Sequence, residues 1–136
     1  MLASALLAAT AVASTARRRA TVARVAAARA GTEARRVAAE VLLGWDGAAD
    51  SLAVGAELHR AVSTPATNGL PISVRAHIRR LAPDFYSVVA AVRVGPGARG
   101  VAFRRLHLLL ERIAPADSGE VRSLVPLVRW SVVDRQ

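Results

Sequence analysis

Residues 87–113 read SVVAAVRVGPGARGVAFRRLHLLLERI, and the fold of the chain depends on how this stretch is interpreted. Its centre, residues 95–100, contains the letters Gly-x-Gly-x-x-Gly. A dinucleotide-binding fingerprint places these letters between a strand and a helix, with an acidic residue about 20 positions later. The alternative is a turn between two amphipathic helices, in which the glycines serve the chain reversal and Pro96 limits flexibility.

The context of the glycines favours the turn. The acidic residues at the required distance precede the next candidate strand, and too few residues follow Gly100 to supply the parallel strands of a nucleotide crevice. The apolar run before the glycines fits a helical period as well as an alternating one. Pro83 and Asp84 before it are typical of a helix start, because proline in the first turn loses no needed donor. We therefore predict helices over 83–94 and 101–113.

Composition also favours helices. Of the 136 residues, a one-domain length, 53% are hydrophobic but only 4% are aromatic. The core must be built from Leu, Val and Ala, and alanine is the strongest helix former but buries little area. We predict an all-α fold, a small helical bundle over residues 32–136 with a flexible loop at 63–71. Further helices are expected from Glu33 to near Gly44, over 51–62 and over 72–81, and from a capping box at Asp117 and Glu120, while 124–133 fits a short strand or a helix.

The charge of the chain has two interpretations. All 19 basic side chains are arginine, against ten carboxylates, and the net charge is +9. A guanidinium pairs bidentately with phosphate and stays charged, so the excess indicates recognition of an anion. Codon bias in a GC-rich genome gives the same composition, and it is favoured because the arginines are spread along the whole chain. The absence of cysteine excludes disulfides, thiolate metal sites and a cysteine nucleophile.

The first 16 residues, MLASALLAATAVASTA, carry no charged side chain and are followed by three arginines. As a membrane anchor this segment is short, since about 20 apolar residues cross a bilayer, and the arginines would hold the next segment on the cytoplasmic side. An organelle transit peptide fits the acid-free, arginine-containing composition of residues 1–32, and a soluble helix or a secretory signal are further alternatives. We predict a membrane anchor and a membrane-associated location, with organelle targeting as the alternative.

Six arginines fall on one broad side of a helix drawn over residues 17–43. On a helical wheel, three lie close to one direction and three lie roughly 100 to 120° away. Such a side is a candidate contact for anionic lipid headgroups or nucleic acid, although a solvated face is the commoner outcome. Gly31 weakens the helix, because glycine costs about 1 kcal/mol in a helix interior, so 17–31 is either a basic linker or a separate helix. The candidate anion-binding residues are Arg17, Arg18, Arg24, Arg29, Arg35 and Arg36.

Residues that carry catalysis are sparse. The closest ligand pairing among the three histidines, His59, His77 and His107, is that of His107 with Glu111, which supplies two metal ligands at most. A fuller site would have to be assembled from distant segments, so each histidine is interpreted as a surface or packing residue. The chain has no nucleophile elbow and no Walker loop. We therefore expect no enzyme activity, no cofactor, no metal and no small-molecule substrate.

Three segments resemble, in order, parts of the helical cytoplasmic domain of the type II secretion F family, including its Tad-type pilus members. They are RRVAAEVLLG (35–44), PDFYSVVAAVRV (83–94) and EVRSL (120–124), and they cover about a third of the chain. A glycine-containing turn lies between the last two helices in that family. The resemblance implies a nonenzymatic inner-membrane platform that contacts an assembly ATPase, and it assigns no functional residues.

Residues 74–89, VRAHIRRLAPDFYSVV, are similar to the BH3 helix of the Bcl-2 apoptosis regulators. Ile78 and Phe85 correspond to its anchors, but Pro83 stands where that motif has its aspartate. A proline at that position would break the helix that the motif requires.

The sequence thus predicts a nonenzymatic, membrane-associated scaffold or interaction protein of a secretion or pilus assembly type. A protein partner is expected, and an anionic membrane surface and nucleic acid are further candidate partners. The main alternative is a basic helical module that binds nucleic acid or another polyanion. Nucleotide binding at residues 95–100 and a Bcl-2-like regulator are the minor alternatives.

Overall fold

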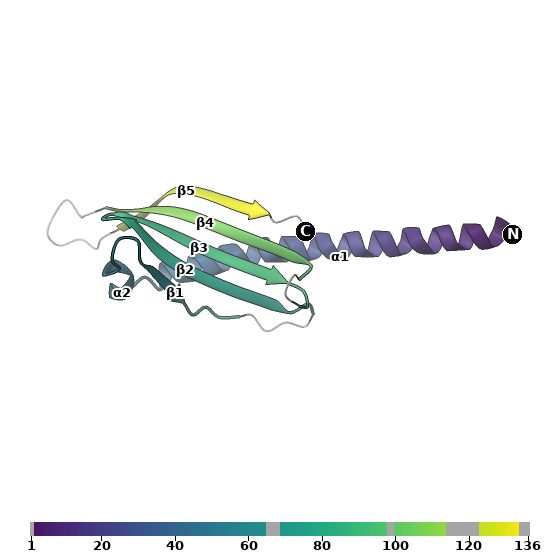
Figure 1. Ribbon diagram of the computed structural model, residues 1–136, viewed down its shortest axis with the longest axis horizontal. Coiled ribbons are helices and arrows are strands. Elements are labelled where there is room, and N and C mark those ends of the chain that lie inside the picture. The colour runs from purple at the N-terminus through teal and green to yellow at the C-terminus, as the bar shows by residue number, and fades with distance from the viewer. Residues whose placement is uncertain (1, 65–68, 98–99, 114–122, 134–136) are drawn as a thin grey trace.

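The computed structural model combines one long helix with a five-stranded antiparallel sheet, as Figure 1 shows. The structure describes residues 2–64, 69–97, 100–113 and 123–133, and only the backbone of residues 2–11, 123 and 128–133. The prediction of an all-α bundle is therefore wrong. The helical prediction holds for the amino-terminal part of the chain and fails for the carboxy-terminal part.

Helix α1 spans Leu2–Leu43 without interruption. It runs through Gly31, where we expected a break, because neighbouring alanines and arginines are strong helix formers. It ends before Gly44, as predicted, and the amide of Gly44 donates to the carbonyl of Glu40 at 2.9 Å. A single turn of helix, α2 (Gly47–Asp50), follows and is capped by Asp46, whose side chain accepts from the amide of Ala49.

The sheet is a meander in which each strand pairs with the next one along the chain. Its strands are β1 (Glu57–Arg60), β2 (Ile72–Ala82), β3 (Phe85–Val94), β4 (Ala102–Ile113) and β5 (Ser123–Val133). The helices predicted over 51–62, 72–81, 83–94 and 101–113 are thus wrong, and the alternative left open for 124–133 is decided in favour of the strand. The capping box at Asp117 and Glu120 lies outside the described residues.

The residues of β3 show why the helical interpretation failed. The side chains at alternate positions from Tyr86 to Val94 all point to one face and are 0% exposed. Val89 faces the other side of the sheet and is also buried, at 7% exposed. A strand that buries both faces reads as a nearly continuous apolar run, which fits a helical period equally well. The β-branched valines, which pack well on a pleated surface, are the signal that favours the strand.

Two turn sequences belong to hairpins and do not mark helix ends. Pro83 and Asp84 form the two-residue turn between β2 and β3, whose flanking residues Ala82 and Phe85 pair. The glycine-rich segment that begins at Gly95 joins β3 to β4. The predicted loop at 63–71 lies between β1 and β2, and its residues 65–68 are outside the described part.

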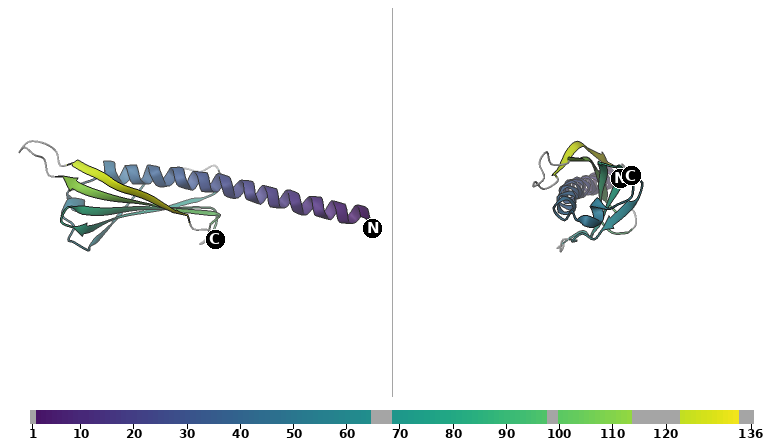
Figure 2. Two further views of the ribbon diagram at one scale, coloured as in Figure 1. Left: turned by 90° about the horizontal axis from the view of Figure 1, so that it is seen from above. Right: turned by 90° about the vertical axis from the view of Figure 1, so that its left-hand side faces the viewer.

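The molecule has two layers, with α1 lying along one face of the sheet (Figure 2). The core lies between them and includes Ile78, Val88 and Leu110. Alanines at every fourth position allow the helix to approach the strands closely. The buried positions of α1 are Ala26, Ala30, Ala34, Val37, Ala38 and Val41.

The membrane-anchor prediction is also wrong. Among the described residues, no helix has both the length and the apolar character that spanning a bilayer requires. In α1, Arg17 follows an apolar run that is rich in alanine and hydroxyl side chains, and this run is shorter than the roughly 20 residues of a membrane span. The predictions of a transmembrane helix and of a membrane-associated location are corrected accordingly.

Candidate functional site

Half of α1 lies beyond the sheet. With 42 residues at about 1.5 Å each, α1 is roughly 60 Å long. Ala26 is its first buried residue among the described side chains, and every side chain from residue 12 to residue 25 is exposed. Figures 1 and 2 show this half extending alone past the end of the sheet. We call residues 2–25 the projecting helix.

The projecting helix exposes apolar side chains to solvent. Val12 is 70% exposed, Val25 is 63% exposed and Val22 is 46% exposed, and residues 2–16 contain no charge. Isolated helices of this length are marginal in water even when they are rich in alanine, because most helical stability in proteins comes from packing of an apolar face. The projecting helix is therefore a candidate surface for contact with another molecule.

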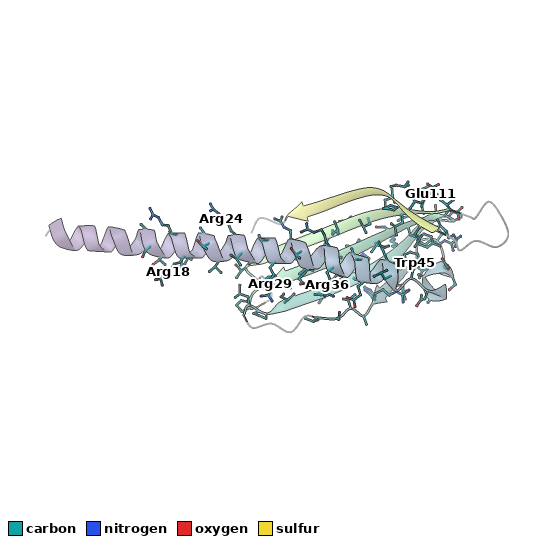
Figure 3. All side chains as sticks on the ribbon, turned by 180° about the vertical axis from the view of Figure 1, so that it is seen from behind. Arg18, Arg24, Arg29, Arg36, Trp45 and Glu111 are labelled. Carbon is teal, nitrogen blue, oxygen red and sulfur yellow. The ribbon has the colours of Figure 1, made fainter. Side chains whose placement is uncertain are left out.

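The six predicted anion-binding arginines are divided between two environments. Arg17, Arg18 and Arg24 are exposed on the projecting helix, whereas Arg29, Arg35 and Arg36 belong to the half that lies over the sheet. Figure 3 shows Arg18 and Arg24 beyond the sheet and Arg29 and Arg36 along it. The helix does not bring all six arginines into one free basic face, because Arg36 is held by carboxylates.

Arg36 and Glu40 join α1 to the segment after β1. Arg36 contacts Glu33 and Glu40, each at 2.7 Å, and it also donates to the carbonyl of Ser63 at 2.7 Å. Glu40 accepts from the amide of Ser63 at 3.0 Å. These hydrogen bonds from Ser63 and the contact with Arg36 lower the pKa of Glu40 and favour its charged form.

A second charged pair joins the N-cap of α2 to the edge strand. Arg60 of β1 donates to Asp46 with both terminal nitrogens, one of them at 2.9 Å. The bonds from Arg60 and from the amide of Ala49 lower the pKa of Asp46 to about 2. Asp46 thus holds β1, and Glu40 of α1 holds the segment after it.

An apolar groove lies between the sheet-bound half of α1 and the last two strands. Its volume is about 430 Å³. Leu127 in its wall is 46% exposed. Small side chains on α1 form one wall, so the backbone of a second helix could approach closely. The lining consists of Arg35, Ala38, Ala39 and Leu42 of α1, Leu106 and Leu108 of β4, and Pro126 and Leu127 of β5.

The glycine loop has the geometry of a hairpin connection. Gly95, Gly97 and Gly100 have positive φ angles, and the amide of Val101 donates to the carbonyl of Val94 at 2.7 Å. β3 is a central strand but it is antiparallel, and β4 follows the loop. A phosphate-binding fingerprint needs a helix amino terminus at this point, so the strand-loop-helix interpretation is wrong.

The outer face of the sheet, opposite α1, brings together histidines that are distant from one another in the sequence. His59 of β1 and His77 of β2 are directly paired, and Val89 separates His77 from His107 in the same row. His107 and Glu111, the one ligand pair suggested by helical spacing, lie on a strand. The motif Glu57-x-His59 was missed, although alternating strand geometry places both of its side chains on one face.

No protein family, curated protein or solved structure matches this chain.

Proposed function

We propose that the protein is a nonenzymatic subunit of an assembly of the pilus or secretion type, in which the projecting helix packs against other copies of the same chain. The observation that carries this proposal is that α1 continues past the sheet with every described side chain up to Val25 exposed. Of the three segments that resemble a secretion and pilus assembly family, residues 35–44 lie almost entirely in α1, whereas residues 83–94 contain β3, so the proposal rests on the projecting helix and not on that resemblance.

Packing against other copies would bury the apolar surface of the projecting helix. Residues 2–16 have no charge, so they can enter an apolar environment without burying an ionised side chain. Arg17, Arg18 and Arg19 follow directly and would lie where the interface meets solvent. Long arginine side chains can lie along apolar surface while their guanidinium groups stay in water.

The groove supports a second copy as the partner. One chain provides both a projecting helix with exposed apolar side chains and an apolar groove beside α1, with Ala38 and Ala39 in its wall. If the projecting helix of one copy enters the groove of the next, the contact joins two different surfaces. Such head-to-tail contacts produce rings when the rotation closes and open helical filaments when it does not.

Sedimentation velocity of the full chain over a range of concentrations tests the proposal. We expect the wild-type protein to associate. The variant Val12→Glu should associate at least tenfold more weakly, because a carboxylate on the projecting helix would be buried in the interface. Glutamate is a good helix former, so the substitution leaves α1 intact.

Leu43→Glu is the matched control. Leu43 lies on the same helix and is 90% exposed, but it is at the end furthest from the projecting part. This variant should associate like the wild type. A wild-type chain that stays monomeric at all concentrations, or equal association of the two variants, would contradict the proposal.

A further inference from the structure

Three side chains of the outer sheet face bring potential metal ligands close together. Glu57 Oε1 lies 3.4 Å from His59 Nε2 and 3.7 Å from His77 Nδ1. All three ligand atoms lie within 4.8 Å of one another. Two neutral imidazoles and a carboxylate form a ligand set that is common for zinc and related transition metals.

We propose that Glu57, His59 and His77 bind a divalent transition metal ion of the zinc class. Zinc bonds of about 2.0 to 2.1 Å place neighbouring ligands of a tetrahedral site roughly 3.3 to 3.4 Å apart. The two separations from Glu57 are close to that value before any ion is bound. Three protein ligands leave the fourth position to water.

The β1-β2 register brings all three ligands together, and the exposed His59 side chain is the one that can adjust. Glu57 and His59 are alternate residues of β1, so they share a face, and His77 is the direct partner of His59 in the β1-β2 register. The His59 side chain is 82% exposed, whereas that of His77 is 31% exposed. Because the His59 imidazole is exposed, it has room to rotate toward the other two ligands.

The electrostatics around His77 are mixed. Burial lowers its pKa, as do the charges of His59, Arg105 and Arg79, while Glu57 acts in the opposite direction. A neutral imidazole is the form that binds a metal ion. The nearby arginines repel a cation, so we expect micromolar binding and no tight structural zinc site.

A bound ion would connect the shortest strand to the body of the sheet. β1 has four residues and, within the described part of the chain, pairs with β2 alone, so it is an edge strand. Coordination by Glu57 and His59 on one side and His77 on the other would hold the two strands in register. The ion would stabilise the folded state, because the ligands are brought together only by folding.

Calorimetric titration of zinc chloride into the untagged, metal-free full chain tests the site. We expect about one equivalent to bind and the melting temperature to rise. His59→Ala should weaken zinc binding at least tenfold, and Glu57→Gln should also weaken it. His59 is largely exposed, so its replacement leaves the fold intact. Cobalt bound at the same site should give a visible absorption spectrum typical of an ion in a low-symmetry coordination environment. Magnesium should not bind, because it prefers oxygen ligands.

His107→Ala provides the control on the same sheet face. Val89 lies between His77 and His107, and His107 is outside the ligand group. This variant should bind zinc like the wild type. Absence of zinc binding by the wild-type chain, unchanged binding by His59→Ala, or an equal loss in His107→Ala would overturn the proposal. None of these outcomes depends on self-association through the projecting helix.

Discussion

At the scale of single residues, Tyr86 combines close packing with a buried hydroxyl for which the described residues offer no hydrogen-bond partner. It is 0% exposed, and its ring meets Trp45 edge-on with a centroid distance of 5.2 Å. The guanidinium groups of Arg80 and Arg112 lie over the ring at 5.5 and 5.8 Å. Its hydroxyl oxygen is buried and has no hydrogen-bond partner among the described residues. The ring contributes to stability, whereas the hydroxyl opposes it.

Tyr86→Phe is therefore expected to raise the free energy of unfolding by about 1 kcal/mol, because an unpaired buried hydroxyl costs about 1 to 3 kcal/mol. The ring contacts remain in this variant. Urea unfolding followed by tryptophan fluorescence, from Trp45 and Trp130, measures the change. Tyr86→Leu is the comparison: it loses the ring contacts and should be less stable than the wild type. A loss of stability in Tyr86→Phe would show that the hydroxyl forms a hydrogen bond in solution.

At the scale of secondary structure elements, the hairpin loop between β3 and β4 depends on its glycines to different degrees. Gly95 has φ of +114°, and a Cβ atom there would lie 2.5 Å from the amide nitrogen of Val101. Gly97 has φ of +74°, and no atom lies within 4 Å of the position of a Cβ atom. Both positions require a left-handed backbone, but only Gly95 also lacks space.

Gly95→Ala should lower the free energy of unfolding by about 2 to 4 kcal/mol, since it adds a backbone clash to the conformational strain. Gly97→Ala should lower it by only about 1 kcal/mol, the cost of the left-handed conformation. Chemical denaturation of both variants gives the comparison. Equal losses would mean that the loop rearranges to accommodate either side chain.

The same elements show how much of the fold can be predicted from the sequence. The end of α1 before Gly44 and the uncharged amino-terminal segment follow from local patterns, as does the turn at residues 95–100. The strands do not, because β3 buries Val88 and Val89 on opposite faces and so loses the alternating pattern that identifies a half-buried strand. An alanine-rich composition then favours helices everywhere, although the alanines of the core mostly belong to α1.

The two candidate sites also differ in how far they can be predicted from the sequence. The projecting helix is visible in the sequence as the uncharged run before Arg17, which we wrongly interpreted as a membrane anchor. The cluster of Glu57, His59 and His77 depends on the register between β1 and β2, which brings together residues separated by a loop. No local pattern carries that information, because pairing register is set by long-range packing.

At the scale of the whole molecule, the chain consists of a folded body and a helix that leaves it. The sheet packs against α1 from Ala26 onward, and no described side chain before that position is buried. The stability of the body should therefore be independent of the first 16 residues, while association should depend on them. The two properties can be measured separately on the same variant.

Removal of residues 1–16 is expected to leave the melting temperature of the body within about 4 °C of the wild-type value, since about 1 kcal/mol corresponds to 4 to 8 °C for a domain of this size. Near-ultraviolet circular dichroism, which reports the environment of Trp45 and Tyr86, follows that transition at a concentration where the wild type is monomeric. The same variant should lose concentration-dependent association in sedimentation velocity. A large fall in the melting temperature of the monomer would show that the projecting helix stabilises the body directly. Retained association would show that the contact between copies lies elsewhere on the molecule.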